Sequence, residues 1–154
     1  MYGCKNLTRV VIPASVVEIE QEVFKNCESL SIVEIYGVPK VANHAFGSHK
    51  ITHFKAPGLV DANGSPWWKE HFGDYNTYIA ASDNFNPESK IAKYAKKCYE
   101  EAFRAIVERD RVDLLPNFLS MWKKFDQKVL DNLLEIIDSE ENAEFYELLM
   151  EWKK

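Results

Sequence analysis

The sequence is poor in the features that mark many catalytic and membrane proteins. Only six glycines occur among its 154 residues, and they form neither a phosphate-binding loop nor the G-x-S-x-G elbow of a serine hydrolase. No apolar run approaches the roughly 18–20 residues that a membrane helix requires. The N-terminus lacks the charged and apolar segments of a secretory leader. We therefore expect a cytoplasmic protein, unless the chain is a fragment of a longer exported one.

Cysteine is scarce as well. The three cysteines, Cys4, Cys27 and Cys98, are odd in number and show no C-x-x-C spacing. A disulfide framework uses an even set of cysteines, so reduced thiols in a cytosolic setting are expected. Cys98 would be a nucleophile only if His71 and an acid approached it in space. Its neighbours on the predicted helix face are small and apolar, which favours a core position.

Three of the four histidines, His44, His49 and His53, lie within ten residues of one another. Such a group could hold a metal, but no cysteine pair provides the spacing that zinc sites use. The sequence therefore predicts no metal, no cofactor and no enzymatic activity.

Positive charge is in deficit. The chain has 19 Lys and Arg against 24 Asp and Glu, which gives a formal net charge of −5. Residues 1–65 hold six of each sign, whereas residues 66–154 hold 13 basic and 18 acidic side chains. A nucleic-acid-binding face needs a basic excess to neutralise phosphates, so direct binding to nucleic acid is not expected. An acidic surface instead suits a protein partner with a basic patch.

The sequence does contain an internal repeat. The segment CKNLTRVVIP at residues 4–13 recurs 23 residues later as CESLSIVEIY at residues 27–36. A third unit begins at Ile51 and ends in the turn-rich residues 58–64. The second halves of the first two units match after a one-residue deletion, where Val16, Ile19, Val23 and Phe24 recur as Val38, Val41, Ala45 and Phe46.

The pattern C-x-x-L-x-x-V-x-I-P-x-S-V-x-x-I-x-x-x-x-F-x-x-C at residues 4–27 resembles the BspA-like leucine-rich repeat. The copy at residues 27–49 departs from it, because Tyr36 replaces the proline and His49 stands where the next cysteine would be. The resemblance covers about residues 3–57. It implies a parallel-stranded solenoid that binds proteins or surfaces and has no intrinsic catalysis.

Alternation along the predicted strands defines a row of outward side chains. Neighbouring residues on a strand point to opposite faces, so every second position faces out. Val11 and Ile32 are apolar at such positions, and an exposed apolar patch on a repeat face is typical of a protein-binding site. The protein's own helices could cover the row instead. The outward residues are Arg9, Val11, Ile32, Glu34, His53 and Lys55.

The residues that follow the repeats predict helices. A short helix should begin with Ser65 as its cap and Pro66 at its first position, and a brief strand is expected at Thr77–Ala80. Asn86 followed by Pro87 predicts the start of a longer helix whose apolar face extends to residue 106. Apolar stripes over residues 114–125, 129–137 and 145–152 predict three more helices in a small bundle.

Two surfaces of this part are candidates for contact. Trp67 and Trp68 could anchor a partner, because tryptophan is favoured at interfaces, or could pack between the repeats and the bundle. The last two helices are rich in acid, which indicates either a solvated face or a docking surface for a basic partner. The acidic residues are Asp131, Glu135, Asp138, Glu140, Glu141, Glu144, Glu147 and Glu151.

These patterns together predict an α+β protein. A short parallel-stranded solenoid of two to three units should occupy residues 1–65, a connector with a short helix residues 66–85, and a small helical bundle residues 86–154. The first functional hypothesis is a non-enzymatic module that binds another protein through the outward strand row and the tryptophan pair. The alternative is a small acidic bacterial inhibitor of the mobile-element or anti-defence type (anti-CRISPR-like). It would block a nucleic-acid-binding protein through its acidic helices, and high salt should weaken that contact.

Overall fold

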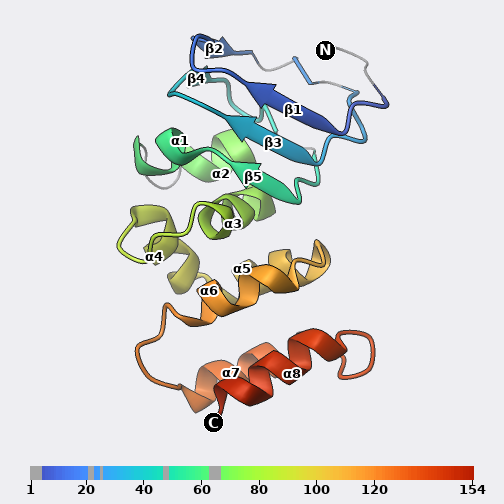
Figure 1. Ribbon diagram of the computed structural model, residues 1–154, viewed down its shortest axis with the longest axis vertical. Helices are drawn as coiled ribbons and strands as arrows, with labels where there is room; N and C mark the ends of the chain where they lie inside the picture. The colour runs from blue at the N-terminus through green and yellow to red at the C-terminus, as the bar shows by residue number, and fades with distance from the viewer. Residues whose placement is uncertain (1–4, 21–22, 25, 47–48, 63–66) are drawn as a thin grey trace.

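The first part of the molecule is built from two sheets, and the strands within each sheet are parallel. The computed structural model describes residues 5–20, 23–24, 26–46, 49–62 and 67–154. Strands of successive repeats lie side by side in it (Figure 1). One sheet has the order β1-β3-β5, with β1 at Arg9–Ile12, β3 at Ile32–Ile35 and β5 at His53–Lys55; the other pairs β2 (Glu18–Ile19) with β4 (Lys40–Val41).

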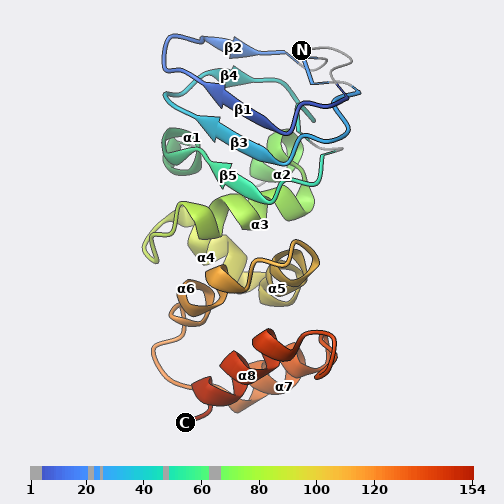
Figure 2. The ribbon, with the colours of Figure 1, turned by 45° about the vertical axis from the view of Figure 1, so that its right-hand side comes forward.

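Helices follow the sheets in layers. Figure 2 shows α1, α2 and α3 beside the sheet, and α7 and α8 at the opposite end of the molecule, near the C-terminus. Within the described residues, no helix combines the length and the apolar character that spanning a bilayer demands. The helices are α1 (Pro57–Ala62), α2 (Trp67–Phe72), α3 (Asp74–Asp83), α4 (Lys90–Lys97), α5 (Tyr99–Glu108), α6 (Leu115–Leu119), α7 (Gln127–Leu134) and α8 (Ala143–Trp152), with a 3-10 turn η1 (Val112–Leu114) before α6.

The repeat pattern places its apolar positions in the core. Parallel pairing puts Val10 beside Val33 and Val33 beside Phe54, so equivalent residues of successive repeats stack on one another. All three are buried, and the alternation of buried and open positions follows from the period of two along a strand. The other buried members of these repeat positions are Ile12, Leu30, Ile35, Ile51 and Ala56.

Four phenylalanines continue the core from the repeats into the helices. Phe24 stacks on Phe46 with ring centroids 5.3 Å apart, and Phe46 meets Phe54 edge to face at 5.5 Å. The ring centroid of Phe54 in turn lies 4.6 Å from that of Phe72 of α2. Burying one such ring contributes roughly 2–3 kcal/mol, so this line of contacts stabilises the junction of sheet and helices.

The second halves of the repeats fit the expected alignment only in part. Ile19 and Val41 are buried partners in the β2–β4 pair. Val38, which the alignment matches to the half-buried Val16, is instead 63% exposed. Just before Val38 the chain turns through Gly37 at φ +96°, a backbone conformation that favours glycine.

Two expectations for the residues between the repeats and the bundle are wrong. Thr77–Ala80 is not a strand but lies within α3, and the turn-rich residues after Ala56 include helix α1. Thr77, Tyr78, Ile79 and Ala80 are all buried. A helix segment buried on every side has no apolar stripe with a period of 3.6, and from sequence it resembles a buried strand. The expected cap residues Ser65 and Pro66 lie outside the described residues.

The long helix expected after Asn86 is two helices. Its cap is Ser89, whose hydroxyl accepts from the amide of Ala92 at 3.2 Å. Asn86 instead forms a preceding turn, in which its side chain accepts from the Glu88 amide. The chain leaves helical geometry at Cys98 and re-enters it as α5. The apolar residues before and after Cys98 follow the same helical period, so the sequence gives no sign that the helix is interrupted there.

The C-terminal helices agree better with expectation. α7 and α8 lie within or beside the predicted stripes, and Asp126 caps α7 by accepting from the Val129 amide at 3.2 Å. The helix predicted over residues 114–125 is shorter, because α6 ends at Leu119. α8 packs against both α6 and α7. The buried side chains form one hydrophobic cluster that extends from β1 to Leu149.

Candidate functional site

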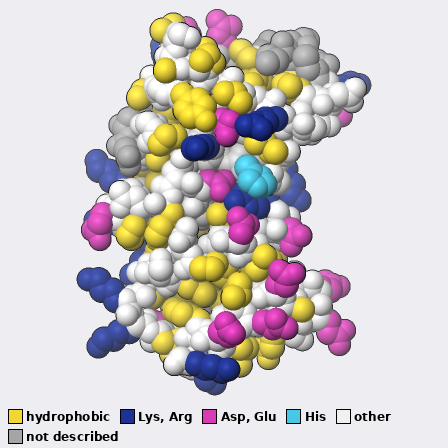
Figure 3. Space-filling model, in the orientation of Figure 1, with side chains coloured by type: hydrophobic (Ala, Val, Ile, Leu, Met, Phe, Trp, Pro, Cys, Tyr) yellow, Lys and Arg dark blue, Asp and Glu magenta, His cyan; other side chains and the backbone are white. Residues whose placement is uncertain are grey.

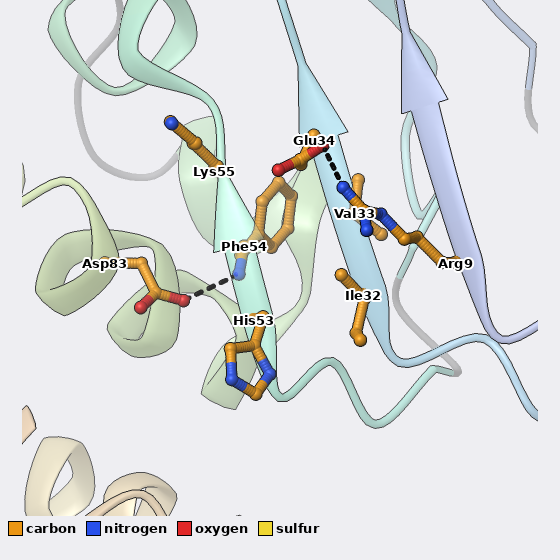
Figure 4. A pocket seen from close by; sticks show the side chains of 8 residues that line it. All are labelled: Arg9, Ile32, Val33, Glu34, His53, Phe54, Lys55 and Asp83. Carbon is orange, nitrogen blue, oxygen red and sulfur yellow. Dashed lines mark hydrogen bonds and ion pairs between the residues drawn. The ribbon is translucent and has the colours of Figure 1, made fainter. Parts of the chain in front are cut away.

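The outward row of the three-stranded sheet lines a groove. Pairing places Arg9, Ile32 and His53 side by side, with Glu34 beside Lys55 two positions further along the strands. These side chains border a hollow of about 410 Å³, and Figure 4 shows them along the strands. We call this hollow the strand-face groove; its lining is completed by Val33, Phe54 and Asp83.

The walls of this groove carry both charge and apolar surface. Arg9 donates to Glu34 at 2.9 Å across the β1–β3 pair. The Arg9 side chain remains 59% exposed, so this ion pair contributes at most about 1 kcal/mol to stability. Val11 is 48% exposed beside the groove, and Ile32 is half-buried within it. Figure 3 shows hydrophobic, basic, acidic and histidine side chains together on this face.

The free edge of β5, at one side of the groove, is closed by side chains rather than by another strand. Asp83 accepts from the Phe54 amide at 2.7 Å. Asn84 accepts from the Ala56 amide at 3.0 Å and donates to the Phe54 carbonyl at 2.8 Å. These bonds reproduce the donors and acceptors of a neighbouring strand. The β5 edge is therefore not open to strand addition at these positions.

Asn76 of α3 hydrogen-bonds the backbone at the beginning of the same edge, just before β5. It is 2% exposed, and its Oδ1 accepts from the Ile51 amide at 3.1 Å. Its Nδ2 lies 2.8–2.9 Å from three carbonyl oxygens, those of Phe46, His49 and Phe72. One buried amide thus joins the second repeat, the third repeat and α2.

Arg109 adds a cation to this edge. Its Nε donates to the Ile51 carbonyl at 3.0 Å, and its Nη2 donates to Asn76 at 3.2 Å. Nη1 lies 3.7 Å from the Glu108 carboxylate, which is an ion pair but too long for a hydrogen bond. Burial lowers the pKa of Arg109, while the charge of Glu108 and the nearby Tyr75 oppose that shift.

Arg111 links the edge to two carboxylates. It donates to the Thr52 carbonyl, to Asp83 at 2.8 Å and to Asp113 through two bonds of 2.9 Å. Burial disfavours its charge, but the hydrogen bonds to Asp113 and Asp83 outweigh burial and raise the pKa of Arg111. The hydrogen bond from Arg111 in turn lowers the pKa of Asp113. This bidentate geometry fits a guanidinium and not an ammonium.

Trp68 does not extend the groove. Trp68 is 1% exposed and packs with its ring 5.9 Å from that of Tyr94. That burial removes Trp68 from the candidate partner-binding surface and assigns it to packing, the other interpretation of the sequence. The side chain of Trp67 lies outside the described part of the molecule.

The residues considered for chemistry are dispersed. Cys98 is half-buried at the α4–α5 junction, and His53 is exposed on β5. His49 is half-buried, and its Nε2 donates to the Phe24 carbonyl at 3.0 Å, which ties the second repeat to the first. Among the described residues, no three His, Cys, Asp or Glu side chains converge as a metal site would require.

Tyr78 of α3 has a pKa far above its usual value. Burial is the main cause, and the hydrogen bond that the Tyr78 hydroxyl donates to Glu101 is the second.

The acidic residues of the last two helices all lie at the surface. Figure 3 shows acidic side chains gathered at the lower right, around the end of the molecule that holds α7 and α8. Asp138 accepts from the amides of Glu140 and Glu141 in the loop between these helices, and these bonds lower its pKa. The exposed residues are Asp131, Glu135, Asp138, Glu140, Glu141, Glu144, Glu147 and Glu151.

The side chains that close the β5 edge were missed by the sequence analysis. Asn76, Asp83 and Asn84 have the spacing i, i+7 and i+8, which places them on one side of a helix. Reading Thr77–Ala80 as a strand concealed that spacing. The contacts of Arg109 and Arg111 with the edge had no local signal, because the carbonyls that they bind, those of Ile51 and Thr52, lie 58 and 59 residues away in the sequence.

Comparison with known proteins identifies the repeats. Residues 1–69 match the family described as BspA type leucine rich repeat region (6 copies). No curated protein and no solved structure matches the chain. Proteins of this repeat family typically mediate protein–protein interactions. With the parallel β1-β3-β5 stack and its buried repeat positions, this match establishes that residues 1–69 of the chain are a BspA-type leucine-rich repeat region.

Proposed function

We propose that this protein is a non-enzymatic binding module that recognises another protein through the strand-face groove. In this proposal residues 1–65 are a short solenoid of two to three units, and the helices close one end of it. The observation that carries the proposal is that outward side chains from β1, β3 and β5 line one open groove. The contact surface comprises Arg9, Val11, Ile32, Glu34, His53 and Lys55.

The character of this groove supports a protein partner. Apolar Val11 and Ile32 supply area to bury, while Arg9 and Lys55 supply donors at the rim. Interfaces between proteins combine an apolar centre with a polar rim in this way. The groove is partly open to solvent, whereas small-molecule sites enclose most of their ligand.

The test compares two double variants. Val11→Glu with Ile32→Glu places two charges on the strand face. Val17→Glu with Val38→Glu is the matched control, because those valines are 81% and 63% exposed and lie outside the groove lining. Each protein is immobilised, and partners captured from a bacterial lysate at low and high salt are quantified by mass spectrometry. We expect a partner that wild type and control retain at both salt concentrations and that the strand-face variant loses.

The second candidate function is the acidic inhibitor. It is supported by the exposure of all six of its proposed contact residues, which leaves them accessible to a partner. These residues are Asp131, Glu135, Glu140, Glu141, Glu144 and Glu147. A contact made by such charges weakens as salt screens them, because the Debye length shortens from about 10 Å at 0.1 M to about 3 Å at 1 M salt. A partner released by salt and indifferent to the strand-face substitutions would favour the inhibitor and contradict the strand-face proposal.

A further inference from the structure

A second groove lies at the opposite end of the molecule, between α6 and α8. Two hollows of about 360 and 380 Å³ adjoin there and share Pro116, Leu148 and Glu151. They therefore form one continuous depression, which we call the C-terminal groove. Figure 3 shows hydrophobic surface at this level of the molecule, with acidic side chains beside it.

The floor of the C-terminal groove is apolar. Leu119 lies at its base with 7% exposure, and Leu148 and Trp152 of α8 are only half-buried. Trp152 packs edge to face on Trp122, with ring centroids 6.0 Å apart. Val112 and Pro116 complete the opposite wall. This groove thus leaves parts of several large apolar side chains accessible to a partner.

The rim of the groove is acidic along α8. Glu144, Glu147 and Glu151 all line it, at helical spacings of three and four residues. None of these three carboxylates makes an ion pair or hydrogen bond with another side chain in the described ranges. Asp113 on the opposite wall is already paired with Arg111. The uncompensated negative charge therefore lies on one side of the groove only.

We propose that the C-terminal groove binds a basic amphipathic helix of another protein. A depression between two helices accepts a third helix by the ridge-and-groove packing that helices share. The apolar face of such a helix would cover Leu119, Leu148 and Trp152, and its lysines or arginines would lie along the three glutamates. α8 has 10 residues and is about 15 Å long, so the groove accommodates a helix of roughly three turns.

The charge distribution also predicts where along the bound helix its basic residues lie. Glu144 and Glu147 line only the hollow that contains Val112, and Glu151 lines both hollows. Lys96 lies over the Trp122 ring, 5.6 Å from its centroid, toward the other hollow. The basic residues of the partner should therefore be concentrated near Glu144 and Glu147 and be fewer beside Trp122.

The test uses two fluorescent synthetic peptides and the intact protein. Each peptide is an amphipathic helix of about four turns with leucines at helical spacing. One carries lysines beside the leucines, and the other carries glutamates at the same positions. Fluorescence anisotropy at low salt should show that the lysine peptide binds at least about tenfold more tightly, with a difference that narrows at high salt.

Two charge variants locate the contact. Glu147→Lys with Glu151→Lys should weaken binding of the lysine peptide by about tenfold. Glu135→Lys with Glu140→Lys is the matched control, because it changes the net charge equally at exposed positions that do not line the groove. It should weaken binding less than about threefold. Leu148→Ala should weaken binding at both salt concentrations, and circular dichroism verifies that each variant is folded.

Three results would overturn the proposal. The first is equal affinity for both peptides, and the second is an equal loss of affinity in the two charge variants. The third is a stable dimer of the protein that the lysine peptide fails to dissociate, which would assign the groove to a second copy of the chain. The Val11→Glu and Ile32→Glu variant should bind the peptide normally, so this proposal and the strand-face proposal can fail independently.

Discussion

At the scale of single residues, the side chain of Asn76 replaces part of a missing strand. Its two polar atoms contact the Ile51 amide, Arg109 and three backbone carbonyls. Leaving such buried groups without partners costs about 1–3 kcal/mol for each group. A single amide therefore accounts for a large share of the stability of the β5 edge.

Asn76→Ala should lower the free energy of unfolding by about 3 kcal/mol, because several buried backbone groups lose their partner together. Asn117→Ala is the control, since Asn117 is exposed on α6 and its replacement should cost less than about 0.5 kcal/mol. Urea denaturation of both variants measures the difference. Equal stability of the two variants would show that Asn76 does not hold the edge.

The Arg111–Asp113 pair predicts how stability depends on pH. The folded protein holds the pKa of Asp113 below its ordinary value, chiefly through the hydrogen bond from Arg111. The pair therefore stabilises the fold above the ordinary carboxyl pKa of about 3.9, and that stabilisation is lost as pH falls through the lower folded value. The Asp113 side chain is 63% exposed, so the effect should be only about 0.5 kcal/mol.

Asp113→Asn should consequently reduce the difference in unfolding free energy between neutral and acidic solution. Urea denaturation of wild type and variant at pH values above and below the carboxyl range measures this difference. If the variant lost as much stability in acid as wild type does, the pair would not contribute.

At the scale of elements, the repeats were predictable and the helices that close them were only partly so. A period of two along β1 and β3 and a recurring phenylalanine identify the stacked repeat positions directly. Helix α3 escaped prediction because its residues from Asn76 to Ala81 are all buried, which removes the helical stripe. The outward strand residues were identified from the sequence, but Asp83 was missed, because the strand expected at Thr77–Ala80 concealed the helical spacing and its partner Phe54 lies 29 positions away.

The start of α4 gives a direct test of local capping. Ser89→Ala should destabilise the protein by about 1 kcal/mol, because the Ala92 amide loses its acceptor. Asn86→Ala should cost less, since Asn86 orders only the exposed turn before the helix. Thermal unfolding of the two variants measures which substitution costs more stability. A larger loss of stability in Asn86→Ala would indicate that Asn86, as expected from the sequence, is the cap of this helix.

At the scale of the whole molecule, repeats and helices share one hydrophobic core. The buried cluster extends from Val10 to Leu149, and Phe72 of α2 packs directly on Phe54 of β5. Repeat units depend on their neighbours for burial, so the last unit needs the helices beside it.

A fragment of residues 1–62 should therefore fail to fold by itself. It lacks α3 and with it the side chains that satisfy the edge of β5. Circular dichroism should show little ordered structure in the fragment and no cooperative thermal transition. A cooperative transition in the fragment would show that the repeats are stable without the helices.

Covalent footprinting of the protein with its captured partner tests the central claim most directly. Carboxylates and amines are labelled in the free and bound protein, and mass spectrometry measures each site. Binding through the strand-face groove should protect Glu34 and Lys55 while leaving Glu135 and Glu140 as reactive as before. Unchanged labelling of Glu34 and Lys55, with protection confined to the acidic helices, would contradict the account.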